Sequence, residues 1–203
     1  MPIKNLILDL GGVIFDIDYE YTIRAFADVG MDDSGQVYSQ KGQLPVFDLF
    51  EKGLITPNEF CDELRNLCHK DTDNETIVRC WNALLIGIPQ ENIDTLYRLK
   101  EKYRLFLLSN TNEIHEIAFK QNIIDQHGRY FFDEVFEKVY LSHHIHMRKP
   151  DREIFDFVIN DNNLNREECL FIDDSIQHIH GANAAGIEAR LLVKGERLAK
   201  IIS

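Results

Sequence analysis

Cysteine is scarce in this sequence, and a long apolar segment is absent. The four cysteines form no C-x-x-C motif, and no secretory signal precedes them, which indicates reduced thiols in a cytoplasmic protein. Cys61 and Cys68 lie seven residues apart, so we expect them on one buried face of a helix. No apolar run approaches the ~18 residues that a membrane span needs. We therefore expect no membrane partner.

Basic residues are also few. The chain contains 22 Lys and Arg against 34 Asp and Glu, a formal net charge of −12. Non-specific affinity for nucleic acid comes from clustered Lys and Arg, so this balance argues against a nucleic-acid partner. A small anionic substrate would need a local cation or a metal ion to approach such an acidic protein.

The order of the apolar patterns predicts an α/β protein. Residues 5–10, NLILDL, are the short branched-apolar run expected of a strand buried on both faces of a parallel sheet. From residue 19 to about 85, apolar residues recur at three-to-four spacing, which indicates helices. After Pro89, helices alternate with short apolar runs, as in βαβ units.

A chain of 203 residues can bury one core and carry a sizeable insertion. We expect a Rossmann-like parallel sheet core, residues 1–16 and 88–203, with an inserted all-helical cap, residues 17–87. Within the cap, Thr56 followed by Pro57 and Glu59 is a helix start.

Polar residues follow four of the predicted strands. Ligands of open parallel sheets bind beyond the carboxyl ends of the strands. The residues at these ends are Asp9, Ser109-Asn110-Thr111-Asn112, Arg148-Lys149-Pro150 after Leu141-Ser142, and Asp173-Asp174-Ser175. Each group alone could be a turn or a helix cap. Together they place three carboxylates, a hydroxyl and a lysine at one edge of one sheet, which favours a reactive site.

The charges of this edge indicate its chemistry. Three neighbouring carboxylates repel one another unless a cation lies among them, and an all-oxygen site suits Mg²⁺. A phosphate could then enter, held by Lys149 and Ser109. One oxygen of Asp9 could bind the metal while the other attacks phosphorus. Gly11 would let the backbone turn its carbonyl to the metal, and Gly12 would open space for backbone amides.

These residues resemble the haloacid dehalogenase-like hydrolase superfamily, in its phosphatase branch with a helical cap. LILDLGG, LLSNTN, MRKP and FIDDS with the following GANAAG are similar to the four motifs of that superfamily, in order. The combination of DLGGVIFDID, LSNTNEIH and LSHHIHMRKP looks closest to the members that dephosphorylate glucose 1-phosphate and related small phosphates.

The resemblance implies a Mg²⁺-dependent phosphatase that acts on a small phosphorylated substrate through an aspartyl-phosphate. Asp9 would be the nucleophile and a metal ligand, and Lys149 would balance charge between nucleophile and phosphate. The other implied metal ligands are the carbonyl of Gly11, Asp174 directly, and Asp173 beside it or through water. Ser109 and Asn110 would hold the phosphoryl group.

One position departs from the family pattern. Typical phosphatases of the superfamily carry a second Asp two residues after the nucleophile, as general acid and base, and Gly11 stands there. General acid–base help is typically worth ~10²–10⁴-fold. Its loss predicts a preference for good leaving groups or a substitute acid. The candidates for that acid are Asp16, Asp18 and His115; His178 is expected behind the metal ligands or at the surface.

Other interpretations stay open. Asp173 and Asp174 argue against a dehalogenase, which needs no metal, and Gly11 argues against a phosphomutase. A catalytically weak relative that binds a phosphorylated ligand or a protein is a further alternative. His143 to Lys149, HHIHMRK, could hold zinc or form a loop near the active site. The helical insertion is expected to act as a lid, with residues 39–53 contributing most to specificity.

Overall fold

The core of the protein is a five-stranded, fully parallel sheet. In the computed structural model, which describes all residues except 32–37, 40–41, 44, 69–70 and 202–203, the strand order is β7-β6-β1-β8-β9. The strands are β1 (Asn5–Leu8), β6 (Arg104–Ser109), β7 (Lys138–Leu141), β8 (Cys169–Asp173) and β9 (Glu188–Leu191). β1 lies in the centre, paired with β6 on one side and β8 on the other. The expected parallel α/β core is confirmed.

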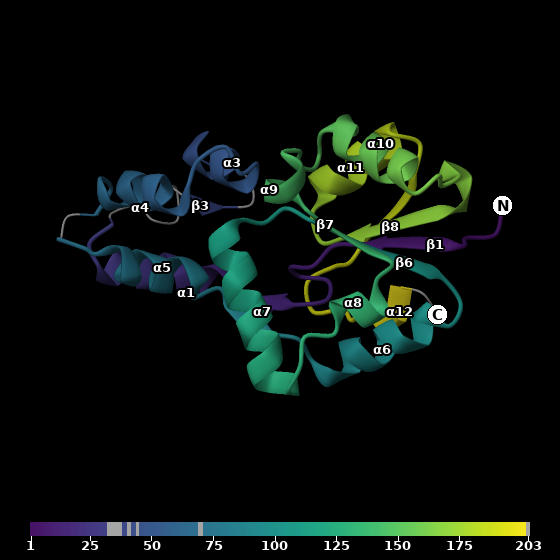
Figure 1. Ribbon diagram of the computed structural model, residues 1–203, viewed down its shortest axis with the longest axis horizontal. Helices are drawn as coiled ribbons and strands as arrows, with labels where there is room; N and C mark the ends of the chain where they lie inside the picture. The colour runs from purple at the N-terminus through teal and green to yellow at the C-terminus, as the bar shows by residue number, and fades with distance from the viewer. Residues whose placement is uncertain (32–37, 40–41, 44, 69–70, 202–203) are drawn as a thin grey trace.

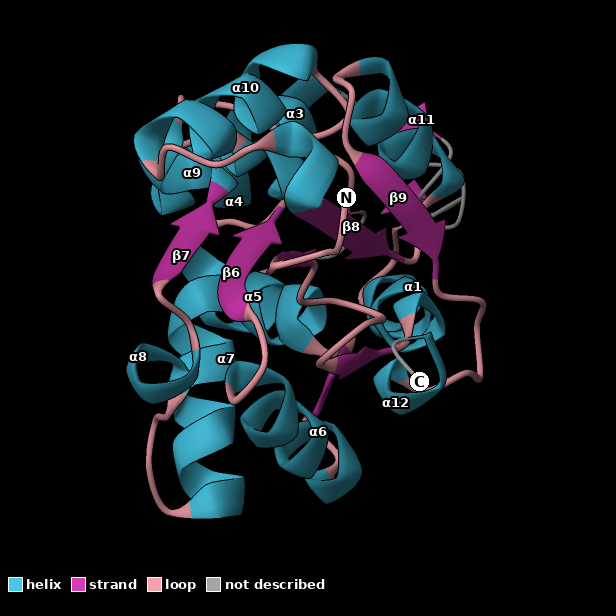
Figure 2. Cartoon of the chain, turned by 90° about the vertical axis from the view of Figure 1, so that its right-hand side faces the viewer, coloured by secondary structure: helices cyan, strands magenta, loops and turns pink. Residues whose placement is uncertain are grey.

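Helices cover both faces of this sheet (Figures 1 and 2). Leu6 and Leu8 of β1 point to one face and Ile7 to the other, because side chains alternate along a strand. The Leu6 face packs against α6 (Gln90–Lys100), α7 (Glu113–His127), α8 (Phe132–Val135) and α12 (Leu198–Ile201). The Ile7 face packs against α10 (Arg152–Asp161) and α11 (Ile176–Ala184). Two buried layers therefore hold the strands and the loops that follow them.

The segment after β1 forms a separate group of helices with its own apolar cluster, at the left of Figure 1. Trp81 lies in its centre and stacks on Phe47, while Phe60 packs against both rings. The helices are α1 (Tyr19–Asp28), α3 (Pro45–Glu51), α4 (Pro57–Arg65) and α5 (Asn74–Asn82). Thr56 and Glu59 form a capping box at the start of α4, which confirms the predicted helix start.

The insertion is not entirely helical, which corrects the expectation from sequence. β3 (Tyr38–Ser39) pairs with β4 (Gly42–Gln43) inside it. Where the chain leaves and rejoins the core, β2 (Asp16–Ile17) pairs with β5 (Leu85–Gly87) in antiparallel orientation. Strands of two or three residues carry too few positions for a recognisable period-two pattern, so they could not be predicted from sequence. The proposed boundaries at 16–17 and 87–88 fall on this pair of strands, and the division into two domains stays a prediction.

A second correction concerns the residues after β7. The sequence favoured a loop there, but Ser142–Ile145 form a short helix, α9. All four cysteines are free thiols. Cys61 is buried on α4, but Cys68 lies beyond the end of that helix and is only partly buried, which corrects the expectation of a shared buried helix face. Among the described residues, no helix is long and apolar enough to span a bilayer.

Candidate active site

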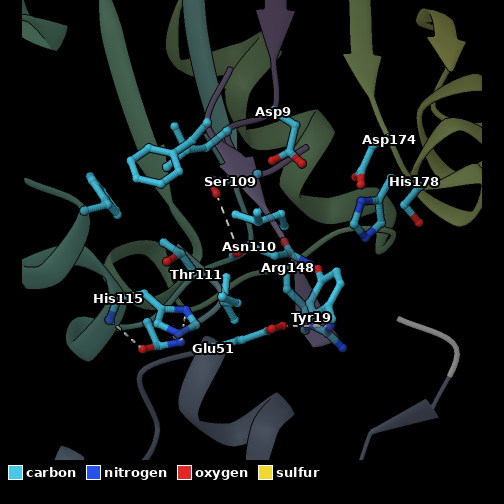
Figure 3. A pocket seen from close by; sticks show the side chains of 18 of the residues that line it. Asp9, Tyr19, Glu51, Ser109, Asn110, Thr111, His115, Arg148, Asp174 and His178 are labelled. Atoms are coloured by element: carbon cyan, nitrogen blue, oxygen red, sulfur yellow. Dashed lines mark hydrogen bonds and ion pairs between the residues drawn. The ribbon is translucent and has the colours of Figure 1, made fainter. Parts of the chain in front are cut away.

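The carboxyl ends of β1, β6 and β8 meet at one cavity of about 270 Å³. Asp9, Ser109 and Asp174 line it, as the sequence predicted, and the insertion closes its other side (Figure 3). The parallel register explains the convergence: Leu8 pairs with Leu107 of β6 and with Ile172 of β8, so the residues that follow lie side by side. The backbone N–H of Asp9 donates to the carbonyl of Ile172 at 2.9 Å.

Lys149 is fully buried between two carboxylates. Its Nζ atom donates to Asp9 Oδ1 at 2.7 Å, to Asp173 Oδ2 at 2.6 Å and to the Leu108 carbonyl at 2.9 Å. Burial lowers the pKa of Lys149, but the two carboxylates outweigh this effect and raise it. A buried ammonium with three acceptors stays charged. Lys149 therefore places a fixed positive charge beside Asp9.

The surroundings of Asp9 have an excess of negative charge. Burial, followed by the nearby carboxylates of Asp173 and Asp174, raises the pKa of Asp9 despite the opposing charge of Lys149. Single oxygen atoms of these three carboxylates lie within 4.8 Å of one another. Oxygen donors at such spacing suit a hard divalent cation, which would also relieve the repulsion. The donor set present therefore fits Mg²⁺.

Asp173 and Asp174 have different surroundings. Asp173 is fully buried, and besides Lys149 it accepts hydrogen bonds from the Ser175 backbone N–H at 2.8 Å and from His178 Nδ1 at 2.9 Å. Burial raises the pKa of Asp173, but Lys149 and His178 outweigh it and lower the pKa to about 2. Its oxygens hold neighbouring side chains in place, whereas Asp174 lines the cavity.

Gly12, rather than Gly11, makes the turn after β1. Gly12 has a φ of +73°, which favours glycine, whereas Gly11 has an ordinary φ. A Cβ at Gly12 would lie 2.4 Å from Asp174 Oδ2, so its missing side chain makes room for that carboxylate. A Cβ at Gly11 would meet only the tip of Ile17, at 3.0 Å. The turn assigned to Gly11 from sequence therefore belongs to Gly12, and metal binding by the Gly11 carbonyl stays a prediction.

Ser109 and Asn110 are placed differently with respect to a phosphoryl group. Ser109 lines the cavity beside Asp9. The side-chain amide of Asn110 donates to the Lys149 carbonyl and accepts from the Lys149 N–H, both at 2.9 Å. The Asn110 side chain thus holds the backbone of Lys149 in place. Only the backbone of Asn110 is then available to contact a phosphoryl group.

The three residues considered as a substitute acid have other partners. His115 stacks on Trp81 with ring centroids 4.8 Å apart, and its Nε2 is 3.1 Å from the Trp81 carbonyl. Burial lowers the pKa of His115 to about 4, so its imidazole is neutral near pH 7. Asp16 pairs with Arg197, and Asp18 caps α1. These contacts argue against all three as the proton donor.

His143 and His144 lie outside the cavity. Both Nε2 atoms are 2.9 Å from Glu116 Oε2, and Lys120 pairs with the other oxygen of that carboxylate at 2.6 Å. Each contact is a hydrogen bond or ion pair, which satisfies the carboxylate without a metal ion. The cluster attaches α9 to α7, so it has a structural explanation in place of the zinc site considered from sequence.

Two acidic residues of the insertion line the cavity, and they and their partner Arg148 were not assigned to the site from sequence. Asp48 and Glu51 of α3 line it opposite Asp9, within the segment 39–53 to which specificity was assigned. Asp48 and Glu51 are three residues apart, so they share one side of a helix. That spacing, with each acidic residue directly after a buried phenylalanine, Phe47 or Phe50, was the available signal.

Comparison with known proteins places the chain in a family. A haloacid dehalogenase-like hydrolase model matches residues 88–191. The D-ribitol-5-phosphate phosphatase of Bacteroides thetaiotaomicron is 32% identical, covering 92% of this chain and 90% of that protein.

Solved structures are also similar to this chain over nearly its whole length. A haloacid dehalogenase family enzyme from the same organism, an Asp-to-Ala mutant in complex with magnesium and inorganic phosphate, is similar with a TM-score of 0.92 at 36% identity, covering 99% of both chains. A Porphyromonas gingivalis protein described as a predicted hydrolase of this family gives 0.87 at 31%, covering 100% and 97%. None of these relatives is described as a glucose 1-phosphatase, so that part of the expectation stays a prediction. The chain belongs to the haloacid dehalogenase-like hydrolase family.

Proposed function

We propose that the protein is a Mg²⁺-dependent phosphatase that hydrolyses a small phosphate monoester through an aspartyl-phosphate. The observation that carries this proposal is the position of Asp9, which contacts buried Lys149 through one oxygen and faces Asp174 across the cavity. A nucleophilic carboxylate, a fixed cation and a second carboxylate for a metal are the groups that this reaction needs. Similarity to a phosphatase and to a magnesium and phosphate complex supports it.

Two steps follow from this arrangement. Asp9 attacks phosphorus through the oxygen that Lys149 does not hold, and the bond from phosphorus to the leaving oxygen breaks; the leaving oxygen keeps the electron pair and takes a proton from solvent. Water then attacks the phosphorus of the aspartyl-phosphate and loses a proton to solvent, while the bond from phosphorus to the Asp9 oxygen breaks, which releases inorganic phosphate and restores Asp9. Ser109 would donate to a phosphoryl oxygen, and Lys149 would offset the negative charge. Mg²⁺, held by Asp9, Asp174 and the Gly11 carbonyl, would neutralise phosphoryl charge when bound.

The cavity limits the size of the substrate. Its volume of about 270 Å³ lies below the roughly 300–1,000 Å³ typical of sites for drug-sized ligands. A sugar phosphate or polyol phosphate is of suitable size. Gly11 favours an acidic leaving oxygen, such as the anomeric oxygen of glucose 1-phosphate, whereas the relative's name points to a primary-alcohol ester, D-ribitol 5-phosphate. Both esters belong to the proposed class.

The test is phosphate release from D-ribitol 5-phosphate, glucose 1-phosphate, a nucleoside monophosphate and phenyl phosphate, with and without Mg²⁺. Asp9→Asn serves as the blank. We expect Mg²⁺-dependent release that Asp9→Asn abolishes. If the folded protein binds Mg²⁺ and phosphate but releases none from any ester, the enzyme assignment fails and the alternative of a binding protein replaces it.

A further inference from the structure

Arg148 connects the insertion to the core at the far end of the cavity. It directly precedes Lys149 and reaches α3 with both terminal nitrogens: Nη1 is 2.6 Å from Asp48 Oδ1, and Nη2 is 2.8 Å from Glu51 Oε2. Figure 3 shows Glu51 and Arg148 together, away from Asp9 and Asp174. The cavity therefore has a phosphate end, built by the core, and a cap end, built by this trio.

The cap end is buried but its hydrogen bonding is incomplete. Glu51 is only 9% exposed. Arg148 Nε is buried and has no hydrogen-bond partner in the described part of the chain. Glu51 Oε2 lies 2.8 Å from Arg148 Nη2, and the carboxylate can accept further hydrogen bonds. Because buried polar atoms are nearly always hydrogen-bonded in native proteins, an unpaired donor beside a carboxylate with spare acceptor capacity, both at a cavity, points to a ligand.

The charges indicate which ligand group belongs there. An alcohol hydroxyl donates one hydrogen bond and accepts others, so one hydroxyl can serve both the carboxylate and the guanidinium. The single positive charge of Arg148 faces the carboxylates of Asp48 and Glu51. A second anionic group on the substrate would meet net negative charge, and a purely apolar group would leave Arg148 Nε unsatisfied.

We propose that Glu51 and Arg148 bind a hydroxyl of the leaving alcohol and so select polyhydroxylated phosphate esters with an uncharged leaving group. This inference rests on the proposed phosphatase function. The two residues hold the leaving group and take no part in bond breaking. At the phosphate end, by contrast, Lys149 and Ser109 would act on the phosphoryl group, which all phosphate esters share.

The rival explanation is that the trio only fastens α3 to the core. Lys52 and Asp151 form another ion pair across the same boundary, 3.4 Å long, and neither residue lines the cavity. Asp151→Asn is thus a matched control: it weakens the attachment of the insertion and leaves the cap end of the cavity intact.

The experiment measures kcat and KM for two kinds of ester in the wild type, Glu51→Leu, Glu51→Gln and Asp151→Asn. One is the polyhydroxylated ester that the wild type hydrolyses best; the other is phenyl phosphate, which has no hydroxyl. Loss of a hydrogen bond to a charged group corresponds to about 10- to 100-fold in binding. We expect Glu51→Leu to raise KM for the polyhydroxylated ester by that factor, with phenyl phosphate and inhibition by inorganic phosphate nearly unchanged.

The remaining variants distinguish binding of the hydroxyl from attachment of the insertion to the core. Glu51→Gln should recover part of the loss, since its amide oxygen still accepts from a hydroxyl, and Asp151→Asn should behave like the wild type on both esters. If Glu51→Leu changes KM equally for both esters, or for neither, the proposal is overturned. It is also overturned if the wild type hydrolyses phenyl phosphate but no polyhydroxylated ester. A wild type that hydrolyses neither ester would instead overturn the proposed function.

Discussion

The lysine of the candidate site is fully buried. Lys149 is surrounded by Asp9, Asp173 and the Leu108 carbonyl. Burying one ammonium is costly, but here two carboxylates and a carbonyl replace its water. Because the carboxylates would otherwise repel each other, the lysine stabilises the fold, in addition to the role in phosphate binding that we propose for it.

Lys149→Met should therefore destabilise the protein. Removing one partner of a buried ion pair leaves uncompensated charge and costs about 3–5 kcal/mol. Urea denaturation at pH 7 measures the free energy of unfolding. The control is Lys4→Met, whose exposed pair with Glu168 should contribute no more than about 1 kcal/mol. Equal stability of the two variants would contradict this account of Lys149.

The two glycines after Asp9 offer a matched pair of substitutions. Gly12→Ala puts a carbon 2.4 Å from Asp174 Oδ2 at a positive φ, whereas Gly11→Ala meets only the movable end of Ile17. Displacing a metal ligand by about 1 Å can cost ~10²-fold in rate. We expect Gly12→Ala to lose about that much phosphatase activity and Gly11→Ala to lose far less. Similar rates for the two variants would sink the assigned role of Gly12.

At the scale of elements, α7 connects the core to the insertion. His115 in its first turn stacks on Trp81 of α5, and Glu116 binds His143 and His144 of α9. One helix thus contacts both the apolar cluster of the insertion and the turn that precedes Lys149. Its buried imidazole makes this junction sensitive to pH.

The stability of the fold should fall as the pH falls from 6.5 to 4. Burial lowers the pKa of His115 from 6.5 to about 4, so in this window the unfolded chain takes up a proton that the folded chain does not. The effect is on the order of 3 kcal/mol. Free energies of unfolding at pH 6.5 and 4.5 should differ less in His115→Gln than in the wild type. His180 is exposed, so His180→Gln should show the same difference in free energy of unfolding as the wild type. The same difference in His115→Gln would refute the prediction.

The sequence predicted some elements and not others for physical reasons. β1 and β8 are short, fully buried apolar runs, so composition alone identified them. The four-residue α9 is too short for a helical period and contains two histidines, so it was taken as a loop. Strand order then explains why Asp9, Ser109 and Asp174 could be brought together from sequence.

Residues that depend on tertiary contacts were beyond the sequence. Asn110 looked like a phosphate ligand, and only the folded chain shows its amide occupied by the backbone of Lys149. Glu51 lies 97 residues before Arg148, so their contact required the insertion to be placed on the core. Local patterns report which residues share a strand end or a helix face, but not which faces meet.

At the scale of the whole molecule, ligand binding should stabilise the native state. The proposed metal ligands directly follow β1 and β8, which are far apart in the chain. A ligand at 100 times its Kd adds about 2.7 kcal/mol. We expect Mg²⁺ with inorganic phosphate to raise the Tm of the wild type and of the exposed control Asp133→Asn, and to have little effect on Asp174→Asn. An equal rise in all three proteins would place the metal elsewhere.

The central place of β1 in the sheet also has a consequence for biosynthesis. During synthesis β1 is made before both of the strands with which it pairs, because β6 and β8 come much later in the chain. Until those strands emerge, its apolar residues and both rows of backbone hydrogen-bonding groups stay uncovered. The growing chain must therefore keep β1 from aggregating until β8 has been made, whereas the helices between β1 and β6 can form earlier.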